Sequence, residues 1–326
     1  MLLCCAMVTL GACNASTSGG TQQNQHDCYQ RFGVTLSGAE GVGSDYSRPT
    51  QSELQYYASK GVELIRLEVR WDKLQPDLNG PFNADEVSWI ERFVSQAHAL
   101  GVSVDLDLHQ RADYDDLNLG QDGIPPASLV DFWTKFATVL KKDQVPGICG
   151  FGIANEPNHE RDDLGHWPEQ ANAVIAAITA VDSKHFIFVG EDQWDSSFSW
   201  NAAQARQIHG SQVVFEAHSY WDKGYAGNYQ PDLPPSDPEA VGVNNLRPFV
   251  DWCHQTNNQC FVGEFGVPPD ERWLTALDAA LRYMQRSRVF GAYWAGGPGY
   301  NDILSIEPSA SGRDAPQMGV LQKYLA

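Results

Sequence analysis

The sequence predicts a single (β/α)8 barrel, and three observations support this fold. Short apolar runs alternate with longer amphipathic stretches along the chain, which favours repeated βα units and a parallel sheet. Eight such runs are present, and a chain of 326 residues is long enough for one barrel of about 250 residues with insertions. Polar residues gather where the runs end, which is where barrels of this kind carry their sites.

Each apolar run is a predicted strand. The eight strands are expected near residues 31–36, 63–69, 102–108, 148–154, 185–191, 212–218, 260–264 and 289–295. The amphipathic stretches between them predict helices at 52–60, 84–100, 128–142, 169–181, 240–254 and 271–288. Gly61 and Gly101 directly follow the first two helices, where glycine commonly ends a helix. No shift in composition divides residues 28–326, so we expect one folded domain over this range.

Polar side chains stand at the ends of six of these runs. They are Arg66, the segment Asp107-Leu108-His109-Gln110, Asn155-Glu156, His218-Ser219-Tyr220, Glu264 and Trp294. Packing of a barrel requires none of them, and the C-terminal strand ends of a barrel meet on one face. The sequence therefore predicts a single polar site on that face.

Two of these residues are glutamates at the tips of buried strands, Glu156 and Glu264. A carboxylate in such a position loses solvation, so a fold seldom keeps it for stability alone. Two carboxylates facing one pocket are the groups that cleavage of a glycosidic bond requires, because one donates a proton and the other acts as nucleophile or base.

The charge of the chain limits its partners. The formal net charge is −19, and no Lys/Arg-rich run is present. A field of this sign repels phosphate backbones and anionic membranes, so we expect no nucleic-acid partner. The ten tryptophans suit a neutral ligand as well as a large core.

The N-terminus predicts export. Residues 1–12 form an apolar segment too short to span a bilayer, and Leu10-Gly11-Ala12-Cys13 resembles the lipobox of bacterial lipoproteins. We expect residues 1–13 to be a signal peptide with Cys13 as the lipidated residue, and residues 14–27, rich in small polar side chains, to be a flexible tether. The chain would then touch a membrane only through its lipid; plain secretion is the alternative.

Export places the remaining cysteines in an oxidising compartment. Cys28, Cys149, Cys253 and Cys260 permit three sets of pairings. Cys253 and Cys260 flank a short polar turn between a predicted helix and a predicted strand, so a local disulfide is expected there, with Cys28 and Cys149 as the remaining pair. Free buried thiols are the alternative for both pairs. No Cys-x-x-Cys occurs, so we expect neither a zinc site nor a redox motif, and no cofactor.

The chain resembles glycoside hydrolase family 5 from about residue 31 to residue 325. The resemblance rests on Asn155-Glu156-Pro157 and Glu264-Phe265-Gly266, in this order and at the fourth and seventh strands. The segments Ser37-Gly38-Ala39-Glu40, Leu74-Gln75-Pro76 and Ser305-Ile306-Glu307-Pro308 are similar to the secreted endo-β-1,4-glucanases of that family. The resemblance implies a retaining glycosidase with a catalytic domain over residues 28–326, a β-glucan substrate and a monomeric state.

The resemblance also implies roles for individual residues. Glu156 would be the general acid/base, with its pKa raised by burial and by a nearby Glu264, which would be the ionised nucleophile. Arg66 and Tyr220 would stabilise the charge of that nucleophile. Asn155 would donate to a sugar hydroxyl, His109 and His218 would support the site or bind substrate, and Trp294 would lie under the sugar beside the cleavage point.

Several of these residues have a purely structural alternative. Arg66 could only neutralise a buried Asp107, and His218 could be an ordinary core histidine. For four further tryptophans, core packing and sugar stacking are equally favoured; these are Trp71, Trp194, Trp200 and Trp221. Two departures from the family pattern bear on substrate binding: His109-Gln110 stands where His-Asn is usual, and Gly297-Pro298-Gly299-Tyr300-Asn301 replaces a frequent Trp-Trp pair.

Other functions stay open at this point. β-1,4-Mannan, xyloglucan or β-1,3-glucan could replace β-1,4-glucan as the substrate of the same barrel. A lipid-anchored glycan-binding protein without activity is a further alternative, although both carboxylates are present. A metal-dependent hydrolase could draw ligands from His109, His218 and Glu264, but no His-x-His occurs in the chain.

Overall fold

The computed structural model describes residues 28–38, 46–110, 113–115, 117–120, 123–158, 167–229, 234–298 and 302–325. The predicted signal peptide, Cys13 and the tether lie outside these residues, as do Gly299, Tyr300 and Asn301 of the altered loop.

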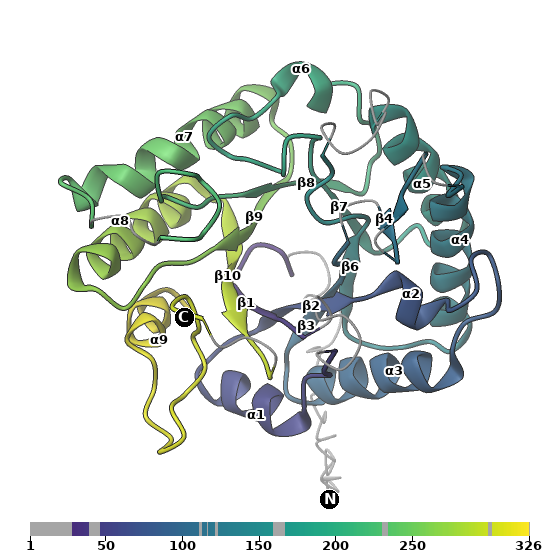
Figure 1. Cartoon of the computed structure of the whole chain (residues 1–326), viewed down its shortest axis with the longest axis horizontal. Helices are drawn as coiled ribbons and strands as arrows, with labels where there is room; N and C mark the ends of the chain where they lie inside the picture. The colour runs from purple at the N-terminus through teal and green to yellow at the C-terminus, as the bar shows by residue number, and fades with distance from the viewer. Residues whose placement is uncertain are drawn as a thin grey trace, which may run out of the picture.

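Eight parallel strands close into a barrel with the order β1-β10-β9-β8-β7-β6-β3-β2, and helices surround it (Figure 1). The barrel strands are β1 (Gly33–Leu36), β2 (Leu64–Val69), β3 (Ser103–Leu108), β6 (Ile148–Gly152), β7 (Phe186–Val189), β8 (Val213–His218), β9 (Cys260–Phe265) and β10 (Phe290–Gly296). A two-stranded sheet of β4 (Asp113–Tyr114) and β5 (Leu117–Asn118) lies after β3. The predicted fold is confirmed, and each predicted strand overlaps an observed one.

The helices that follow the barrel strands are amphipathic and pack their apolar face on the barrel. They are α1 (Gln51–Ser59), α2 (Trp71–Leu74), α3 (Ala84–Ala99), α4 (Ala127–Lys142), α5 (Trp167–Val181), α6 (Ala202–Ala205), α7 (Pro238–Thr256), α8 (Glu271–Ser287) and α9 (Pro316–Leu321), with a 3₁₀ turn at Gln322–Tyr324. All six predicted helices are present. The three that the sequence did not predict, α2, α6 and α9, are too short to show a helical period.

Local signals explain where several helices begin and end. Thr50 and Glu53 form a reciprocal capping box at the start of α1. Gly61 and Gly101 follow α1 and α3 with positive φ angles of 90° and 79°, as expected for glycine after a helix C-terminus. These caps fix the lengths of the helices that join the strands.

The interior of the barrel has an apolar layer below a charged one. Leu64, Cys149, Phe188, Val214, Phe261 and Ala292 come from six strands and form one cluster with Cys28 and Tyr29. Two residues further along β2 and β8, the same faces carry Arg66 and Glu216, because side chains alternate along a strand. The charged layer thus lies toward the C-terminal strand ends, where the site is predicted.

Two disulfides are present. Cys253 joins Cys260 across the turn between α7 and β9, as predicted, and Cys28 joins Cys149 of β6. The second bond ties the start of the described chain to the apolar layer. Within the described part of the chain, no helix has both the length and the apolar character needed to cross a bilayer.

Candidate active site

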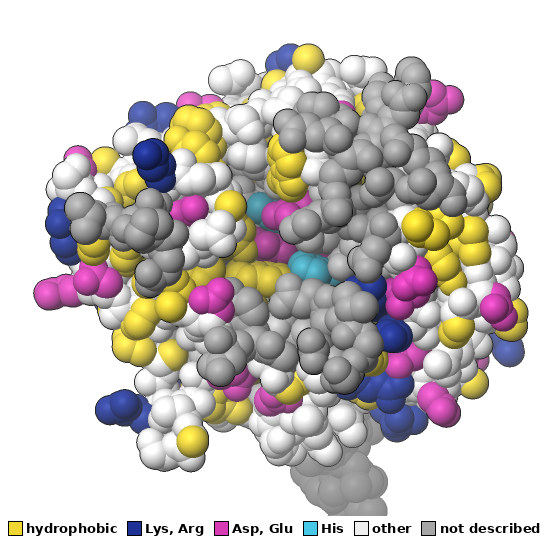
Figure 2. Space-filling view, in the orientation of Figure 1, with side chains coloured by type: hydrophobic (Ala, Val, Ile, Leu, Met, Phe, Trp, Pro, Cys, Tyr) yellow, Lys and Arg dark blue, Asp and Glu magenta, His cyan; other side chains and the backbone are white. Residues whose placement is uncertain are grey.

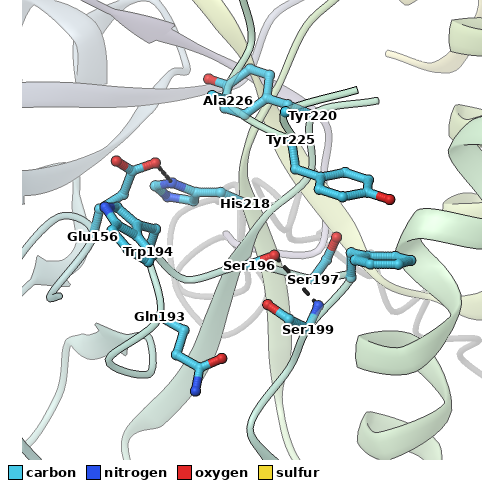
Figure 3. Close-up of a pocket in the computed structure, with 12 residues that line it drawn as sticks. Glu156, Gln193, Trp194, Ser196, Ser197, Ser199, His218, Tyr220, Tyr225 and Ala226 are labelled. Carbon is cyan, nitrogen blue, oxygen red and sulfur yellow. Dashed lines mark hydrogen bonds and ion pairs between the residues drawn. The ribbon is translucent and has the colours of Figure 1, made fainter. Parts of the chain in front are cut away.

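A cavity of about 660 Å³ opens at the C-terminal ends of the barrel strands. Figure 2 shows the molecule hollowed at the centre of this face, with histidine and acidic side chains at the bottom of the hollow. Its walls come from the segments that follow β6, β7 and β8, and Glu156, His218 and Tyr220 are among its lining residues (Figure 3). The predicted polar site and the cavity therefore coincide.

The two glutamates predicted from the sequence lie close together. Glu156 follows β6, Glu264 belongs to β9, and one carboxylate oxygen of each lies within 4.8 Å of the other. Glu264 is buried, whereas the Glu156 side chain is partly open to the cavity. Glu156 has a left-handed backbone conformation, with φ of 48°. A non-glycine residue in this conformation is unusual and persists where its surroundings hold it.

Two donors hold the Glu264 carboxylate. Arg66 Nη1 donates to Oε1 at 3.0 Å, and the Tyr220 hydroxyl donates to Oε2 at 2.8 Å. Both contacts are buried, so the donors face little competition from water. The pairing that the sequence predicted around Glu264 is present in the structure.

Arg66 contacts both of the acids considered for it, Asp107 and Glu264. The side chain is 1% exposed, and its Nη2 lies 3.2 Å from Asp107 Oδ1 and donates to Asn155 Oδ1 at 2.8 Å. Its Nε lies 3.0 Å from Glu216 Oε1. Arg66 therefore neutralises buried acids of the barrel and also orients Glu264. Because Arg66 holds the Asn155 oxygen, the amide nitrogen of Asn155 is the atom that can face a ligand.

His218 lies between the two glutamates. Its Nδ1 is 3.0 Å from Glu156 Oε1 and 3.5 Å from Glu264 Oε2 (Figure 3). Burial by itself lowers the pKa of His218, but the charge of Glu264 and the hydrogen bond with Glu156 outweigh it and raise the pKa well above the usual value. His218 therefore places a positive charge beside both carboxylates, which is more than an ordinary core histidine does.

His109 and Trp294 form a second part of the site. Their rings are stacked, with centroids 5.1 Å apart and planes 14° apart. His109 Nδ1 is 2.7 Å from Asp107 Oδ2, and Nε2 is 3.5 Å from Glu68 Oε1. Burial lowers the pKa of His109, but the charges of Glu68 and Asp107 outweigh it and raise the pKa to about 9. His109 thus acts as a charged support for the Trp294 ring.

The structure adds buried acids that the sequence interpretation missed. Glu216 contacts Arg66 and lies 3.5 Å from His218 Nε2. Glu216 precedes His218 by two residues on the same face of β8, so strand alternation could have identified it. It fits because Gly263 faces it: a Cβ atom at Gly263 would lie 1.7 Å from Glu216 Oε1.

Asp195 is the second missed acid. Its Oδ2 accepts a hydrogen bond from the backbone amide of Glu156 at 2.9 Å, and burial raises the pKa of Asp195 well above its usual range. A Cβ atom at Gly190 would lie 1.7 Å from Asp195 Oδ1, so a side chain at Gly190 would displace this carboxylate. Asp195 stands in an irregular loop, and no sequence period points to it.

The four tryptophans for which core packing and sugar stacking were equally favoured fall into two groups. Trp71, Trp200 and Trp221 are buried in the core, whereas Trp194 is 36% exposed and lines the cavity beside Glu156 (Figure 3). Gln110, the departure next to His109, accepts a hydrogen bond from the backbone amide of Trp71 through its Oε1. This side chain braces the end of β3 against α2 and does not face the cavity lining.

The metal ligands considered from the sequence are not brought together as a set. Among the described residues, the group with metal-ligand spacing is Glu156, His218 and Glu264, and His109 is not part of it. A metal requires a neutral imidazole nitrogen, and the raised pKa of His218 favours the protonated ring instead. The spacing of the three groups would suit a metal, so it is the charge favoured on His218 that points to a proton-sharing site.

Comparison with known proteins agrees with this geometry. The family model "Cellulase (glycosyl hydrolase family 5)" matches residues 22–299. The chain is 23% identical to endo-beta-1,4-glucanase B of Aspergillus niger, over 97% of this chain and 96% of that protein. Among solved structures, endoglucanase Cel5A of Pseudomonas stutzeri is 32% identical with a TM-score of 0.84, over 91% of this chain and 94% of that one. XacCel5A in complex with cellopentaose is 31% identical with a TM-score of 0.83, over 91% and 99%. The family match over most of the chain and the paired glutamates at the strand ends lead to one conclusion: the chain belongs to glycoside hydrolase family 5, the cellulase family, and is a glycosidase.

Proposed function

We propose that the protein is an endo-β-1,4-glucanase that cleaves its polysaccharide by double displacement, with Glu156 as general acid/base and Glu264 as nucleophile. The separation of the two carboxylates carries this proposal. Retaining glycosidases keep their carboxyl groups about 5–5.5 Å apart, whereas inverting enzymes leave about 6.5–9.5 Å for a water molecule. One oxygen of Glu156 lies within 4.8 Å of one oxygen of Glu264, which is shorter than the separation typical of inverting enzymes and favours retention.

In the first step, a Glu264 oxygen attacks the anomeric carbon while Glu156 gives its proton to the glycosidic oxygen, and the leaving sugar departs. Arg66 and Tyr220 donate hydrogen bonds to the two Glu264 oxygens, stabilise negative charge on them and fix the direction of attack. In the second step, Glu156 removes a proton from water, the water oxygen attacks the anomeric carbon, and Glu264 is released. His218 stabilises the negative charge of Glu156 in that step, because it lies 3.0 Å away and is positively charged.

The substrate proposal rests on relatives and on the cavity. The similar proteins carry names of endo-β-1,4-glucanases, and one solved relative holds cellopentaose. Trp294 and Asn155 offer an aromatic face and an amide donor to a neutral sugar. β-1,4-Mannan, xyloglucan and β-1,3-glucan stay as the alternative substrates.

The test of the reaction uses Glu264→Ala, with the exposed Glu239→Ala on α7 as the matched control. Glu264→Ala should abolish hydrolysis of carboxymethyl-cellulose, and Glu239→Ala should leave it intact. Proton NMR of the wild-type reaction should show the β-anomer first. If the α-anomer forms first, double displacement is wrong. Faster hydrolysis of mannan or laminarin than of carboxymethyl-cellulose would overturn the proposed substrate.

A metal-dependent reaction is tested separately. We expect full activity in excess EDTA, because the protonated His218 bridges the two glutamates in place of a cation. Complete loss of activity that zinc or manganese restores would revive the metal alternative.

We also propose that the chain is exported, with residues 1–13 as signal peptide, residues 14–27 as tether and residues 28–326 as the catalytic domain. The two disulfides support an oxidising compartment. Lipidation at Cys13 is tested by fractionation: wild type should partition with membranes and Cys13→Ser should not. Recovery of both proteins in the soluble fraction would contradict lipidation and favour plain secretion.

A further inference from the structure

Two aromatic rings on the rim of the cavity are stacked on each other and stay exposed. The Phe198 and Tyr225 ring centroids are 4.4 Å apart, with 17° between the planes. Phe198 is 46% exposed and Tyr225 is 45% exposed, and both line the cavity that contains Glu156. Of the five most exposed large hydrophobic residues in the described ranges, the three aromatic ones, Trp194, Phe198 and Tyr225, all lie in this cavity. Such clustering on one concave surface marks a ligand site better than single exposed residues do.

The backbone around Tyr225 is built to present this ring. Tyr225 has a φ of 55°, a conformation that costs a bulky residue free energy. Buried Asp222 holds the turn, because its Oδ1 accepts from the Gly227 amide at 2.9 Å and its backbone oxygen accepts from the Tyr225 amide at 3.1 Å. The fold thus maintains a strained turn in order to hold an aromatic ring at the surface.

The position of the pair identifies the part of the substrate that it meets. Among the described residues, those that line this cavity include the proposed proton donor Glu156, whereas Glu264 and Trp294 are not part of the lining. A proton donor delivers its proton to the leaving-group oxygen, so the cavity lies on the leaving-group side of the cleaved bond. Figure 3 shows Trp194 beside Glu156 and the Tyr225 ring across the cavity from it. The departing part of the polysaccharide would therefore pass between these aromatic walls.

We infer that Phe198 and Tyr225 form a stacking platform for a sugar on the leaving-group side of the cleaved bond. This inference rests on the proposed function, since the ligand is the departing segment of a β-1,4-glucan. Each ring covers one face of the other, which leaves an outer aromatic face for the apolar face of a sugar ring. Gln193 and Ser199, which line the same cavity, supply polar groups near the sugar hydroxyls.

The experiment compares a substrate that reaches the platform with one that does not. The ratio of kcat/KM for cellopentaose to kcat/KM for 4-nitrophenyl β-cellobioside is measured for wild type, for the double variant Phe198→Ala/Tyr225→Ala and for Tyr225→Phe. The double variant should lower this ratio about tenfold, because it removes the aromatic face. Tyr225→Phe keeps the ring and should keep most of the ratio. Leu100→Ala is the matched control, since Leu100 is 45% exposed but follows α3 on the opposite face of the barrel.

A second readout maps the bond that is cleaved. In cellopentaose labelled at its reducing end, weaker leaving-group binding should move the cut toward the labelled end in the double variant. If cleavage position and ratio both stay as in wild type, or if both substrates lose activity in parallel, the pair only braces two loops and the platform is wrong. A wild-type protein that leaves every cello-oligosaccharide intact would instead overturn the proposed β-1,4-glucanase function, and the platform's ligand with it.

Discussion

Asp195 anchors the backbone of Glu156 from 39 residues along the chain: its carboxylate accepts the Glu156 amide hydrogen at 2.9 Å. The contact joins the segment after β7 to the segment after β6, and it holds Glu156 in its left-handed conformation. The direction in which Glu156 points is therefore set by a residue that lies outside the family signature.

This anchor predicts the behaviour of Asp195 variants. Asp195→Ala should lower kcat/KM for cellopentaose about 10- to 100-fold, because a displaced acid donates its proton poorly. The loss should be much smaller for 2,4-dinitrophenyl β-cellobioside, whose leaving group needs little protonation. Asp195→Asn keeps an acceptor oxygen and matches the neutral acid that burial favours, so it should recover most of the activity. Equal losses on both substrates would assign Asp195 a purely structural role.

A second prediction concerns the hydroxyl group that Tyr220 donates to Glu264. Tyr220→Phe should lower kcat about 100-fold, because the nucleophile loses one of its buried donors. Tyr324→Phe is the matched control: its hydroxyl donates to the Asp278 carbonyl oxygen outside the cavity, so kcat should be that of wild type. A Tyr220→Phe variant with wild-type kcat would show that Arg66 alone suffices for Glu264.

A third prediction concerns pH. The pKa of His109 is raised in the folded state to about 9, above its unfolded value of about 6.5. Its charged contacts with Glu68 and Asp107 therefore stabilise the fold fully below about pH 6.5, and this contribution is lost as the pH rises through about 9. Urea unfolding of wild type and His109→Asn should give a difference in free energy that is large at pH 6 and smaller at pH 9.5.

The control for this pH dependence is His209→Asn, at an exposed position before β8. Its difference from wild type should not change in the same way between the two pH values. A constant difference for His109→Asn would mean that His109 is neutral in the fold.

We expect the two disulfides to stabilise the fold to different extents. Cys28 and Cys149 are separated by 121 residues, whereas Cys253 and Cys260 are separated by 7. Loop-closure entropy alone gives the long bond about 5 kcal/mol of stabilisation and the short one about 2.5 kcal/mol. Replacing Cys28 and Cys149 by serine should therefore lower Tm more than replacing Cys253 and Cys260. The reverse order would mean that packing around the sulfur atoms outweighs chain entropy.

The sequence predicts the parts of this molecule in which side chains recur at the regular spacing of a strand or a helix. Strand alternation places Arg66 on the interior face, and the strand ends carry Glu156 and Glu264, so the fold and the central pair could be predicted without coordinates. The strand pairing then explains why residues far apart in the chain meet.

The parts that could not be predicted lie in irregular segments. Asp195, Phe198 and Tyr225 stand in loops whose conformation depends on contacts across the cavity, and nothing in their local sequence fixes it. The alternation of side chains along β8 predicts that Glu216 faces the barrel interior. Whether a glutamate fits there depends on the space that Gly263 leaves opposite it. Sequence patterns thus predict the site residues that the strands carry, but not the loop residues that surround them.

The space that Gly190 and Gly263 leave for the neighbouring acids limits how the sequence can change at these positions. Any substitution at either glycine would occupy the space of Asp195 or Glu216, because a Cβ atom there would lie 1.7 Å from a carboxylate oxygen. A side chain at either glycine therefore requires its acid to move or to be replaced by a smaller residue. Variants of this protein that carry a larger residue at position 263 are therefore expected to carry a smaller one at position 216, and the same coupling is expected between positions 190 and 195.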